Sequence, residues 1–270
     1  MRHASAGGAT PTSARVHVES VGAGPPLVLL HGFALHGGVF APILPALART
    51  HRVHVVDLPG HGHSPPVASA TLDTLVDAVA DAVAGERRPL SVLGWSLGGL
   101  CAMRWARRDP ARVARLALVA TSPRFVAGDD WPHAMSAQTL ARFGDEFAAS
   151  WKLTMQRFLA LQVHGSEAGR ATLATLRHQL YARGEPSREA LADSLRLLAA
   201  TDLRGEVGAI VAPALVVSGE RDTLAPAGAG AWLGAALPNA TYVRIDGAAH
   251  APFLSHRAAF DRALDGFLDG

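Results

Sequence analysis

The sequence is poor in cysteine and lysine and lacks long runs of apolar residues. Cys101 is the only cysteine among 270 residues, so no intramolecular disulfide can form. No stretch of about 18 residues is free of polar breaks, which argues against a membrane-spanning helix. The first residues are small and polar, so we expect a flexible N-terminus over residues 1–15 and no secretory signal. These absences favour a cytoplasmic protein.

The charge of the chain is nearly balanced. There are 25 basic and 23 acidic residues, for a formal net charge of +2, and Lys152 is the only lysine. Nucleic-acid-binding proteins usually carry a concentrated basic patch, which so small an excess does not predict. Hydrophobic residues make up 49% of the chain, so we expect a folded protein with a sizeable core. We further expect it to be a monomer.

Short apolar runs bounded by glycine, proline or polar residues predict buried strands. The predicted strands are 27–30, 53–56, 90–93, 116–120, 214–218 and 241–245, and the predicted helices include 72–83, 97–107 and 257–268. Their alternation predicts an α/β protein with a mostly parallel central sheet and helices on both faces. Residues 122–202 have helical patterns and no convincing strand. They predict a helical cap inserted into a core of residues 16–121 and 203–270.

One turn between a predicted strand and a predicted helix has the pattern of a catalytic nucleophile. Gly94-Trp95-Ser96-Leu97-Gly98 matches the G-x-S-x-G elbow, which is typical of the α/β-hydrolase fold in this context. The glycines leave room beside a serine on a strained turn, and the helix start favours negative charge there. The pattern therefore predicts Ser96 as nucleophile and the Leu97 N–H as an oxyanion donor. The alternative is a tight glycine turn with an incidental serine.

An acid and a base follow two later strands. Asp222 lies on the loop after the strand at 214–218 and is favoured over Glu220, which lies closer to the strand end. His250 follows the last strand and is favoured over His256, which lies near a helix start. The order Ser96, Asp222, His250 matches the chain order of the triad in this fold. A solvated turn acid is the alternative for Asp222.

Other chemically capable residues have simpler interpretations. Phe33 follows the first buried strand, where a second oxyanion N–H is required, whereas His31 reads better as a buried imidazole that braces the loop. His61 and His63 suggest a metal pair, but no third ligand with sensible spacing appears, so a polar loop is preferred. Cys101 reads as a small core residue. We therefore expect no metal and no organic cofactor.

Several segments together resemble one family more narrowly than these general motifs do. The sequence resembles the pimeloyl-[acyl-carrier protein] methyl ester esterases of biotin synthesis from about residue 28 to the C-terminus. The resemblance lies in GWSLGGL at 94–100, TSPRF at 121–125, DWP at 130–132, RFLALQ at 157–162, TDLR at 201–204 and AAHAPFLSH at 248–256. It implies a serine carboxylesterase that acts through an acyl-enzyme.

The resemblance also implies a set of substrate contacts. In the family, the stretch that corresponds to Phe158, Leu159, Ala160, Leu161 and Gln162 contacts the acyl chain, together with the residues at Phe33, Ser96, Leu97 and His250. The residues themselves agree in part, since Trp151, Met155, Phe158 and Gln162 share one helix face and could line an alkyl channel. Simple packing of the cap on the core is the alternative for Trp151 and Met155.

The family's substrate is borne by an acidic carrier protein that meets arginines on the cap. Arg157 and Arg170 match those positions, and ordinary solvated side chains are the alternative. Two positions depart from the family: Phe33 replaces a tryptophan, and Ala174 replaces an arginine. These departures put an indole hydrogen bond and part of the carrier contact in question.

The triad does not identify the substrate, because substrate choice depends on the residues of the pocket and not on the fold. The first expectation is hydrolysis of pimeloyl-carrier methyl ester. One alternative is a carboxylesterase or C–C-bond hydrolase for another small substrate. An alternative from a different functional class is a non-catalytic small-molecule receptor with the same fold.

Overall fold

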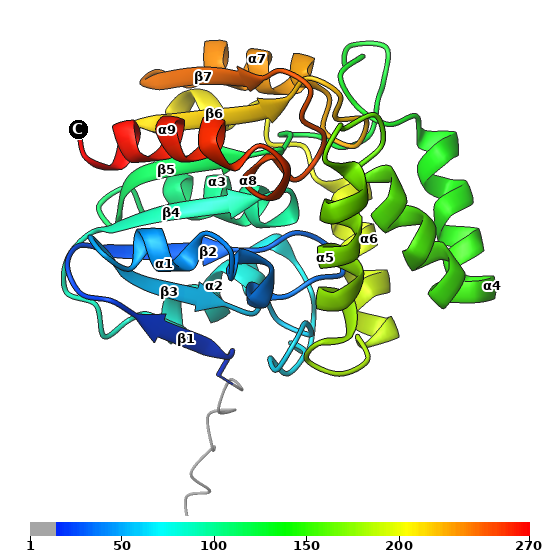
Figure 1. Cartoon of the computed structure of the whole chain (residues 1–270), viewed down its shortest axis with the longest axis horizontal. Coiled ribbons are helices and arrows are strands. Elements are labelled where there is room, and N and C mark those ends of the chain that lie inside the picture. Colours follow the sequence, from blue (N-terminus) through cyan, green and yellow to red (C-terminus); the bar gives the residue numbers. More distant parts are fainter. Residues whose placement is uncertain (1–14) are drawn as a thin grey trace, which may run out of the picture.

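A computed structural model of the chain describes residues 15–270, so the flexible N-terminus expected over 1–15 lies outside the described residues, apart from Arg15. Seven strands form one sheet in the order β1-β3-β2-β4-β5-β6-β7, and only β1 runs antiparallel to its neighbour. The strands are β1 (Val18–Val21), β2 (Pro26–Leu30), β3 (Arg52–Val56), β4 (Leu90–Trp95), β5 (Val113–Val119), β6 (Ala214–Gly219) and β7 (Ala240–Ile245). The predicted fold class is confirmed (Figure 1).

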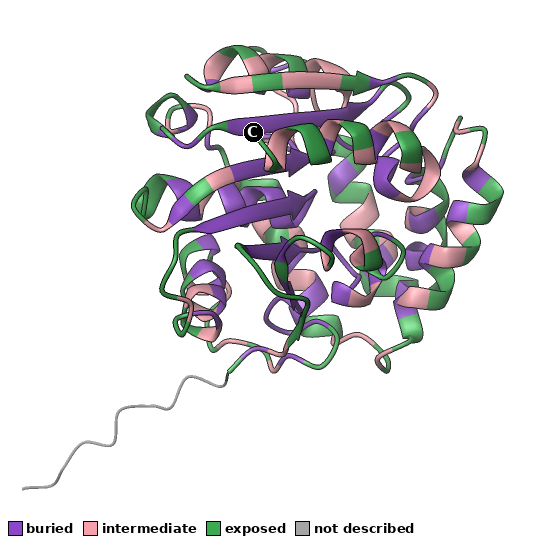
Figure 2. Ribbon diagram, turned by 60° about the vertical axis from the view of Figure 1, so that its left-hand side comes forward, coloured by how far each residue is buried: buried purple, intermediate pink, exposed green. Residues whose placement is uncertain are grey.

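Helices cover both faces of the sheet. α1 (Leu44–Leu47) and α9 (Arg257–Leu268) lie on one face, and α2 (Leu72–Ala82), α3 (Leu97–Arg108) and α7 (Ala227–Ala236) lie on the other (Figure 1). Every residue of β2, β4 and β6 is buried, as expected for strands covered on both sides (Figure 2). This double cover explains why these strands read as continuous apolar runs in the sequence.

Two elements carry no clear pattern in the sequence and were not predicted. β1 is an edge strand with three of its four residues exposed, so it lacks the apolar run of its neighbours. α7 has the sequence AGAGAWLGAA, in which glycine and alanine hide the helical period. Both elements are held by contacts with the rest of the fold: β1 pairs with β3, and α7 packs on β6 and β7.

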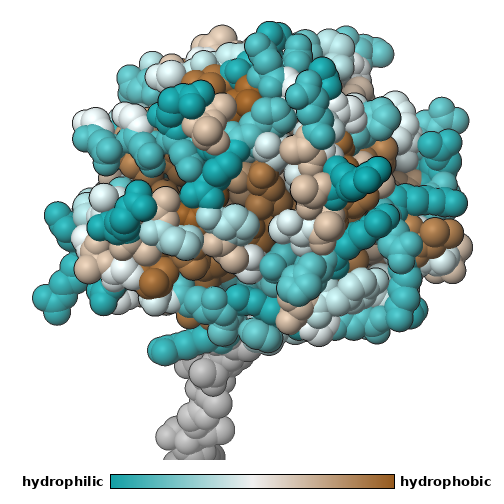
Figure 3. Space-filling model, in the orientation of Figure 1, coloured by the Kyte–Doolittle hydropathy of each residue, from teal (hydrophilic) through white to brown (hydrophobic). Residues whose placement is uncertain are grey.

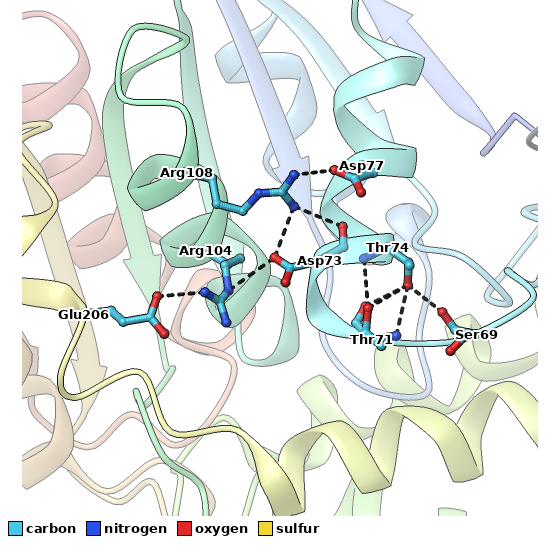
Figure 4. A network of polar contacts seen from close by, with 8 residues as sticks. All are labelled: Ser69, Thr71, Asp73, Thr74, Asp77, Arg104, Arg108 and Glu206. Atoms are coloured by element: carbon cyan, nitrogen blue, oxygen red, sulfur yellow. Dashed lines mark hydrogen bonds and ion pairs between the residues drawn. The ribbon is translucent and has the colours of Figure 1, made fainter.

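Ion pairs join α2 and α3 on the surface (Figure 4). Arg108 lies 2.7 Å from Asp77 and 3.1 Å from Asp73, and Arg104 reaches Glu206 at 2.8 Å. Exposed pairs of this kind contribute roughly 0–1 kcal/mol each. The network lies more than one turn beyond the start of α3, so it steadies the helix without touching the residues at its N-terminus.

The chain between β5 and β6 forms α4 (Ala137–Leu161), α5 (Gly169–Tyr181) and α6 (Arg188–Ala200). These three helices lie beyond the end of the sheet, with α4 on the outer side of α5 and α6 (Figure 1). We refer to residues 122–202 as the cap. Its division from the core at residues 121 and 203 stays a prediction.

The two segments that connect the cap to the core are joined to each other by ion pairs. Arg204 lies 2.9 Å from Asp130 and 2.7 Å from Asp202, and Arg124 lies 3.6 Å from Asp202. The indole of Trp131 donates to the carbonyl oxygen of Arg124 at 2.9 Å, and the Arg204 guanidinium lies over its ring. The DWP and TDLR segments therefore meet at the base of the cap.

The outer surface mixes residue types. Figure 3 shows hydrophilic residues over much of one face, with hydrophobic side chains visible between them. Within residues 15–270, no helix combines the length and apolarity needed to cross a membrane.

Candidate active site

Four predicted site residues follow strands whose carboxyl ends share one edge of the sheet. Phe33 follows β2, Ser96 follows β4, Asp222 follows β6 and His250 follows β7. In open parallel sheets, ligands bind at this edge, near the point where the strand order reverses. That reversal lies between β2 and β4, and the cap helices lie over the same edge.

The backbone at Ser96 is strained in the way that a nucleophile elbow requires. Ser96 has φ 54° and ψ −116°, a conformation that side-chain-bearing residues rarely adopt. A Cβ atom on Gly98 would collide with the Leu30 carbonyl, and one on Gly94 would collide with Gly98. The Ser96 N–H and carbonyl are fixed by Val119 and by the Thr121 hydroxyl, at 3.0 and 2.7 Å. The glycines are thus required by close backbone approach.

The loop after β2 lies directly beside the nucleophile. A Cβ atom on Gly32 would lie 3.2 Å from the Ser96 Cβ, so the backbone leading to Phe33 passes next to that side chain. Leu97 is the first residue of α3, and an N–H at a helix start has no partner within the helix. The N–H groups of Phe33 and Leu97 are therefore well sited to stabilise an oxyanion.

Asp222 and His250 form a buried, oriented pair. The Nδ1 of His250 lies 2.8 Å from Oδ2 of Asp222, and the two side chains are 2% and 0% exposed. The other oxygen of Asp222 accepts the N–H groups of Leu224 and Ala225 at 2.8 and 2.9 Å. Because the carboxylate accepts the Nδ1 proton, Nε2 of His250 is left as the basic nitrogen.

The backbone of His250 is held from two sides. Its carbonyl accepts the Trp95 indole N–H at 2.8 Å, and its own N–H donates to the Gln162 carbonyl at 3.0 Å. Trp95 precedes the nucleophile, and Gln162 is the C-cap residue that follows α4, so both the elbow and the cap position this loop. Among the described residues no hydrogen bond joins Ser96 to His250. Such bonds often tighten only when substrate is bound.

The two rival residues are engaged elsewhere. Glu220 accepts the Gly247 N–H at 2.8 Å and braces the loop before the histidine. His256 lies at the start of α9, where its Nδ1 meets the Ser255 hydroxyl at 2.9 Å. Neither makes a hydrogen bond to Asp222 or to the His250 side chain within residues 15–270.

His31 is a fully buried brace. Its Nε2 accepts the Leu58 N–H at 2.9 Å, so Nδ1 carries the proton and donates to the Gly32 carbonyl at 2.8 Å. Burial, with a smaller contribution from nearby His61, lowers the pKa of His31 from 6.5 to about 3. A neutral imidazole that ties the oxyanion loop to the loop after β3 agrees with the structural role expected for it.

Cys101 is buried in α3, and this burial raises the pKa of its thiol to about 12. A thiol with so high a pKa is not ionised near neutral pH, whereas nucleophilic cysteines react as the thiolate. This agrees with its interpretation as a core residue.

A group of possible metal ligands forms around His63, which the spacing in the sequence did not indicate. His63, His17 and Glu19 bring their ligand atoms within 4.8 Å of one another. His63 lies far along the chain from His17 and Glu19, so no local pattern could have joined the three. Glu19 is already paired with Arg183, and exposed groups of this kind are common without an ion.

The residues expected to contact an acyl chain divide between three surroundings. Phe158 and Leu161 line an apolar cavity of about 60 Å³, together with residues that include Phe33 and Leu224. Ala160 faces an outer groove of about 430 Å³, which Phe158 and Leu161 also line. Leu159 is fully buried in the core, and Gln162 is 1% exposed, with no hydrogen-bond partner for its side-chain oxygen among residues 15–270.

The two predicted carrier contacts are both exposed. Arg157 lines the outer groove and lies 3.2 Å from Glu146, and Arg170 lies near the start of α5. Ala174, where the family has an arginine, is exposed on the same helix. The positions are accessible to a partner, but Arg157 already has an acidic neighbour.

Comparison with known proteins agrees with this geometry. Residues 25–257 match a family model described as the alpha/beta hydrolase fold. The chain is 47% identical over 252 residues to the pimeloyl-[acyl-carrier protein] methyl ester esterase of Chromobacterium violaceum, covering 93% of this chain and 97% of the relative. It is 44% identical to the protein of the same name from Stenotrophomonas maltophilia, covering 94% and 96%.

Solved structures share the fold at lower identity. An esterase from Exiguobacterium antarcticum superposes with a TM-score of 0.86 at 21% identity, covering 94% of this chain and 96% of that one. An enol-lactonase from Burkholderia xenovorans gives a TM-score of 0.81 at 25% identity, with the same two coverages. The elbow, the strand order and the close relatives together show that this chain belongs to the α/β-hydrolase family and, within it, to the pimeloyl-[acyl-carrier protein] methyl ester esterases.

Proposed function

We propose that this chain hydrolyses the methyl ester of a pimeloyl group carried on acyl-carrier protein, with Ser96, His250 and Asp222 as its catalytic triad. The observation that carries the catalytic part is the buried contact between Asp222 and Nδ1 of His250 at 2.8 Å, at the same edge of the sheet as the strained Ser96. The substrate part is supported by relatives that are named pimeloyl-[acyl-carrier protein] methyl ester esterase and align with this chain over nearly their whole length.

The reaction proceeds in two halves. The Nε2 of His250 takes the Ser96 proton as Oγ attacks the ester carbonyl, and the Phe33 and Leu97 N–H groups stabilise the oxyanion. His250 then gives the proton to the departing methoxy oxygen, so methanol leaves and an acyl-enzyme remains. A water molecule, deprotonated by His250, attacks the acyl-enzyme and releases the free carboxylic acid. Asp222 holds the imidazole in the required tautomer and stabilises its charged form.

The acyl chain would lie along the apolar cavity beside Phe33 and Phe158. All of its lining residues except Thr139 are apolar, which suits a polymethylene chain and would disfavour a free carboxylate. The ester would be preferred over the acid product for this reason. Arg157 and Arg170 would meet the acidic carrier. The monomeric state and the cytoplasmic location remain predictions.

Hydrolysis of pimeloyl-carrier methyl ester by the wild type and by Ser96→Ala tests this proposal, with a short nitrophenyl ester alongside. We expect the wild type to release methanol from the carrier substrate and Ser96→Ala to lose this activity on both substrates. Cleavage of only the short ester would keep the triad and reject the carrier substrate. Full activity of Ser96→Ala would reject the triad.

A further inference from the structure

α4 is not one continuous helix, because its path breaks at Ser150. This residue has φ −153° and ψ 74°, far from helical values, and separates residues 137–149 from residues 151–161. Phe143 and Phe158 lie on opposite sides of the break, yet their ring centroids are only 5.6 Å apart. On an unbroken helix they would be about 22 Å apart along the axis. The first half of α4 therefore folds back over the second.

The folded-back half closes one end of the apolar cavity. Phe143 lies 6.3 Å from the Phe33 ring, and Phe158 lies 5.3 Å from it, both in edge-on contact. Thr139, Phe143, Phe158 and Leu161 line both the inner cavity and the outer groove, so the two rings form the wall between them together with these two smaller side chains. We call residues 137–149 the flap.

The cavity behind this wall is small for the proposed substrate. Its volume is about 60 Å³, and one water-sized group occupies about 10–15 Å³ on this measure. A seven-carbon diacid tethered to a carrier would extend beyond it toward the outer groove. A productive complex would therefore require the Phe143 ring to move away from Phe158.

An ion pair ties the flap to the second half of the helix. Glu146 on the flap lies 3.2 Å from Arg157 and 3.9 Å from Arg142, and all three side chains line the outer groove. Phe143 and Glu146 are three residues apart and share one helix face, so the ring contact and the ion pair act together. The pair is exposed, at 61% for Arg157 and 40% for Glu146, so it contributes little to stability and an external anion can compete with it.

We infer that Glu146 is an internal occupant of an anion site formed by Arg142 and Arg157, and that it holds the flap closed over the acyl cavity until an acidic carrier takes its place. This inference rests on the proposed function for the identity of the carrier. The carboxylates of the carrier compete with Glu146 for the two guanidinium groups. Displacement of Glu146 releases the flap, and Phe143 withdraws with it. Docking of the carrier and opening of the apolar cavity are thus one event.

The test compares Glu146→Gln with Asp145→Asn on a neutral free substrate, the dimethyl ester of pimelic acid. Both variants remove one negative charge from the flap, but Asp145 is exposed and makes no ion pair within the described residues, so it is the matched control. We expect kcat/KM for the free diester to rise about fivefold in Glu146→Gln and to stay within twofold in Asp145→Asn. Equal effects of the two substitutions, or no rise in Glu146→Gln, would overturn the inference.

Salt supplies a second kinetic comparison on the same substrate. Raising sodium chloride from 0.05 to 0.5 M screens exposed ion pairs. It should therefore speed diester hydrolysis by the wild type and by Asp145→Asn but leave Glu146→Gln unchanged. The same response in all three proteins would contradict the role of Glu146.

Amide hydrogen exchange measures opening of the flap in the absence of substrate. Residues 137–149 should exchange faster in Glu146→Gln than in the wild type and Asp145→Asn, while residues 151–161 keep their wild-type rates. Unchanged exchange in the flap would overturn the inference. A wild type that fails to cleave the carrier-linked ester would reject the proposed function, whereas the exchange comparison would still decide whether Glu146 holds the flap closed.

Discussion

The guanidinium of Arg183 reaches from the cap to a fully buried carboxylate of the core, with Nη1 lying 2.8 Å from Oδ2 of Asp57. Asp57 follows β3 and also accepts the N–H groups of Gly37 and His63 at 2.8 and 2.9 Å. Burial alone would raise the pKa of Asp57, but the electrostatic interaction with His31, the two N–H groups and Arg183 together outweigh it and lower that pKa. The side of the cap farthest from its connections to the core is therefore anchored by a charge pair.

Replacing Arg183 with alanine should destabilise the protein by roughly 3–5 kcal/mol, because it leaves a buried carboxylate without its positively charged partner. Arg177→Ala is the control, since Arg177 is exposed on α5, and it should change stability by less than about 0.5 kcal/mol. Urea unfolding at pH 7 measures both. Similar midpoints for the two variants would show that the buried pair does not anchor the cap.

The same pair predicts a loss of stability in acid. The folded-state pKa of Asp57 lies below its unfolded value, so its contribution is present above about pH 4 and is lost as the pH falls through the folded-state pKa. The difference in unfolding free energy between the wild type and Arg183→Ala should therefore shrink below that pH. A constant difference from pH 7 down to pH 3 would contradict this.

Substituting His31 should flatten the dependence of stability on pH. The folded-state pKa of His31 is lowered from 6.5 to about 3, so between these values only the unfolded chain binds the proton. Stability then falls with decreasing pH by about 1.4 kcal/mol per pH unit from this residue alone. His31→Asn should lower stability near neutral pH and also remove this slope between pH 4 and 6.

Unfolding free energies of the two proteins over that range measure the difference in slope. Burial also lowers the pKa of His36, His51, His54 and His61, so part of the wild-type slope will remain in the variant. Between pH 7 and 8 the two slopes should agree, which is the internal control. Identical slopes between pH 4 and 6 would show that His31 is not kept neutral by the fold.

Asp222→Asn should show whether Asp222 or Glu220 is the acid of the triad. An asparagine can still accept the Leu224 and Ala225 N–H groups, but its amide would face Nδ1 of His250 and favour the wrong tautomer. We expect kcat to fall by about 10³–10⁴-fold with little change in stability. Glu220→Gln, at the brace to Gly247, should keep kcat within about twofold. A larger loss in Glu220→Gln than in Asp222→Asn would reassign the acid.

Local sequence patterns predicted much of the candidate active site. The elbow around Ser96 could be predicted because its strand, glycines and helix are contiguous and each constrains the same few backbone angles. The positions of Asp222 and His250 followed from the chain order of this fold, since both come after apolar strands. The sequence already favoured Asp222 over Glu220 from its place on the loop, and the structure adds that the two side chains have different partners, His250 and Gly247.

The sequence by itself determined the α/β architecture, the elbow and the family, because these follow from short-range periodicity and from motifs that contiguous residues spell out. Only the tertiary structure decided the pairing of β1, the fold-back of α4 at Ser150, and the contacts of Arg183 with Asp57 and of Glu146 with Arg157. Each of these joins segments that no local pattern connects. Their partners are selected by burial and by the geometry of the whole chain, which a one-dimensional pattern does not contain.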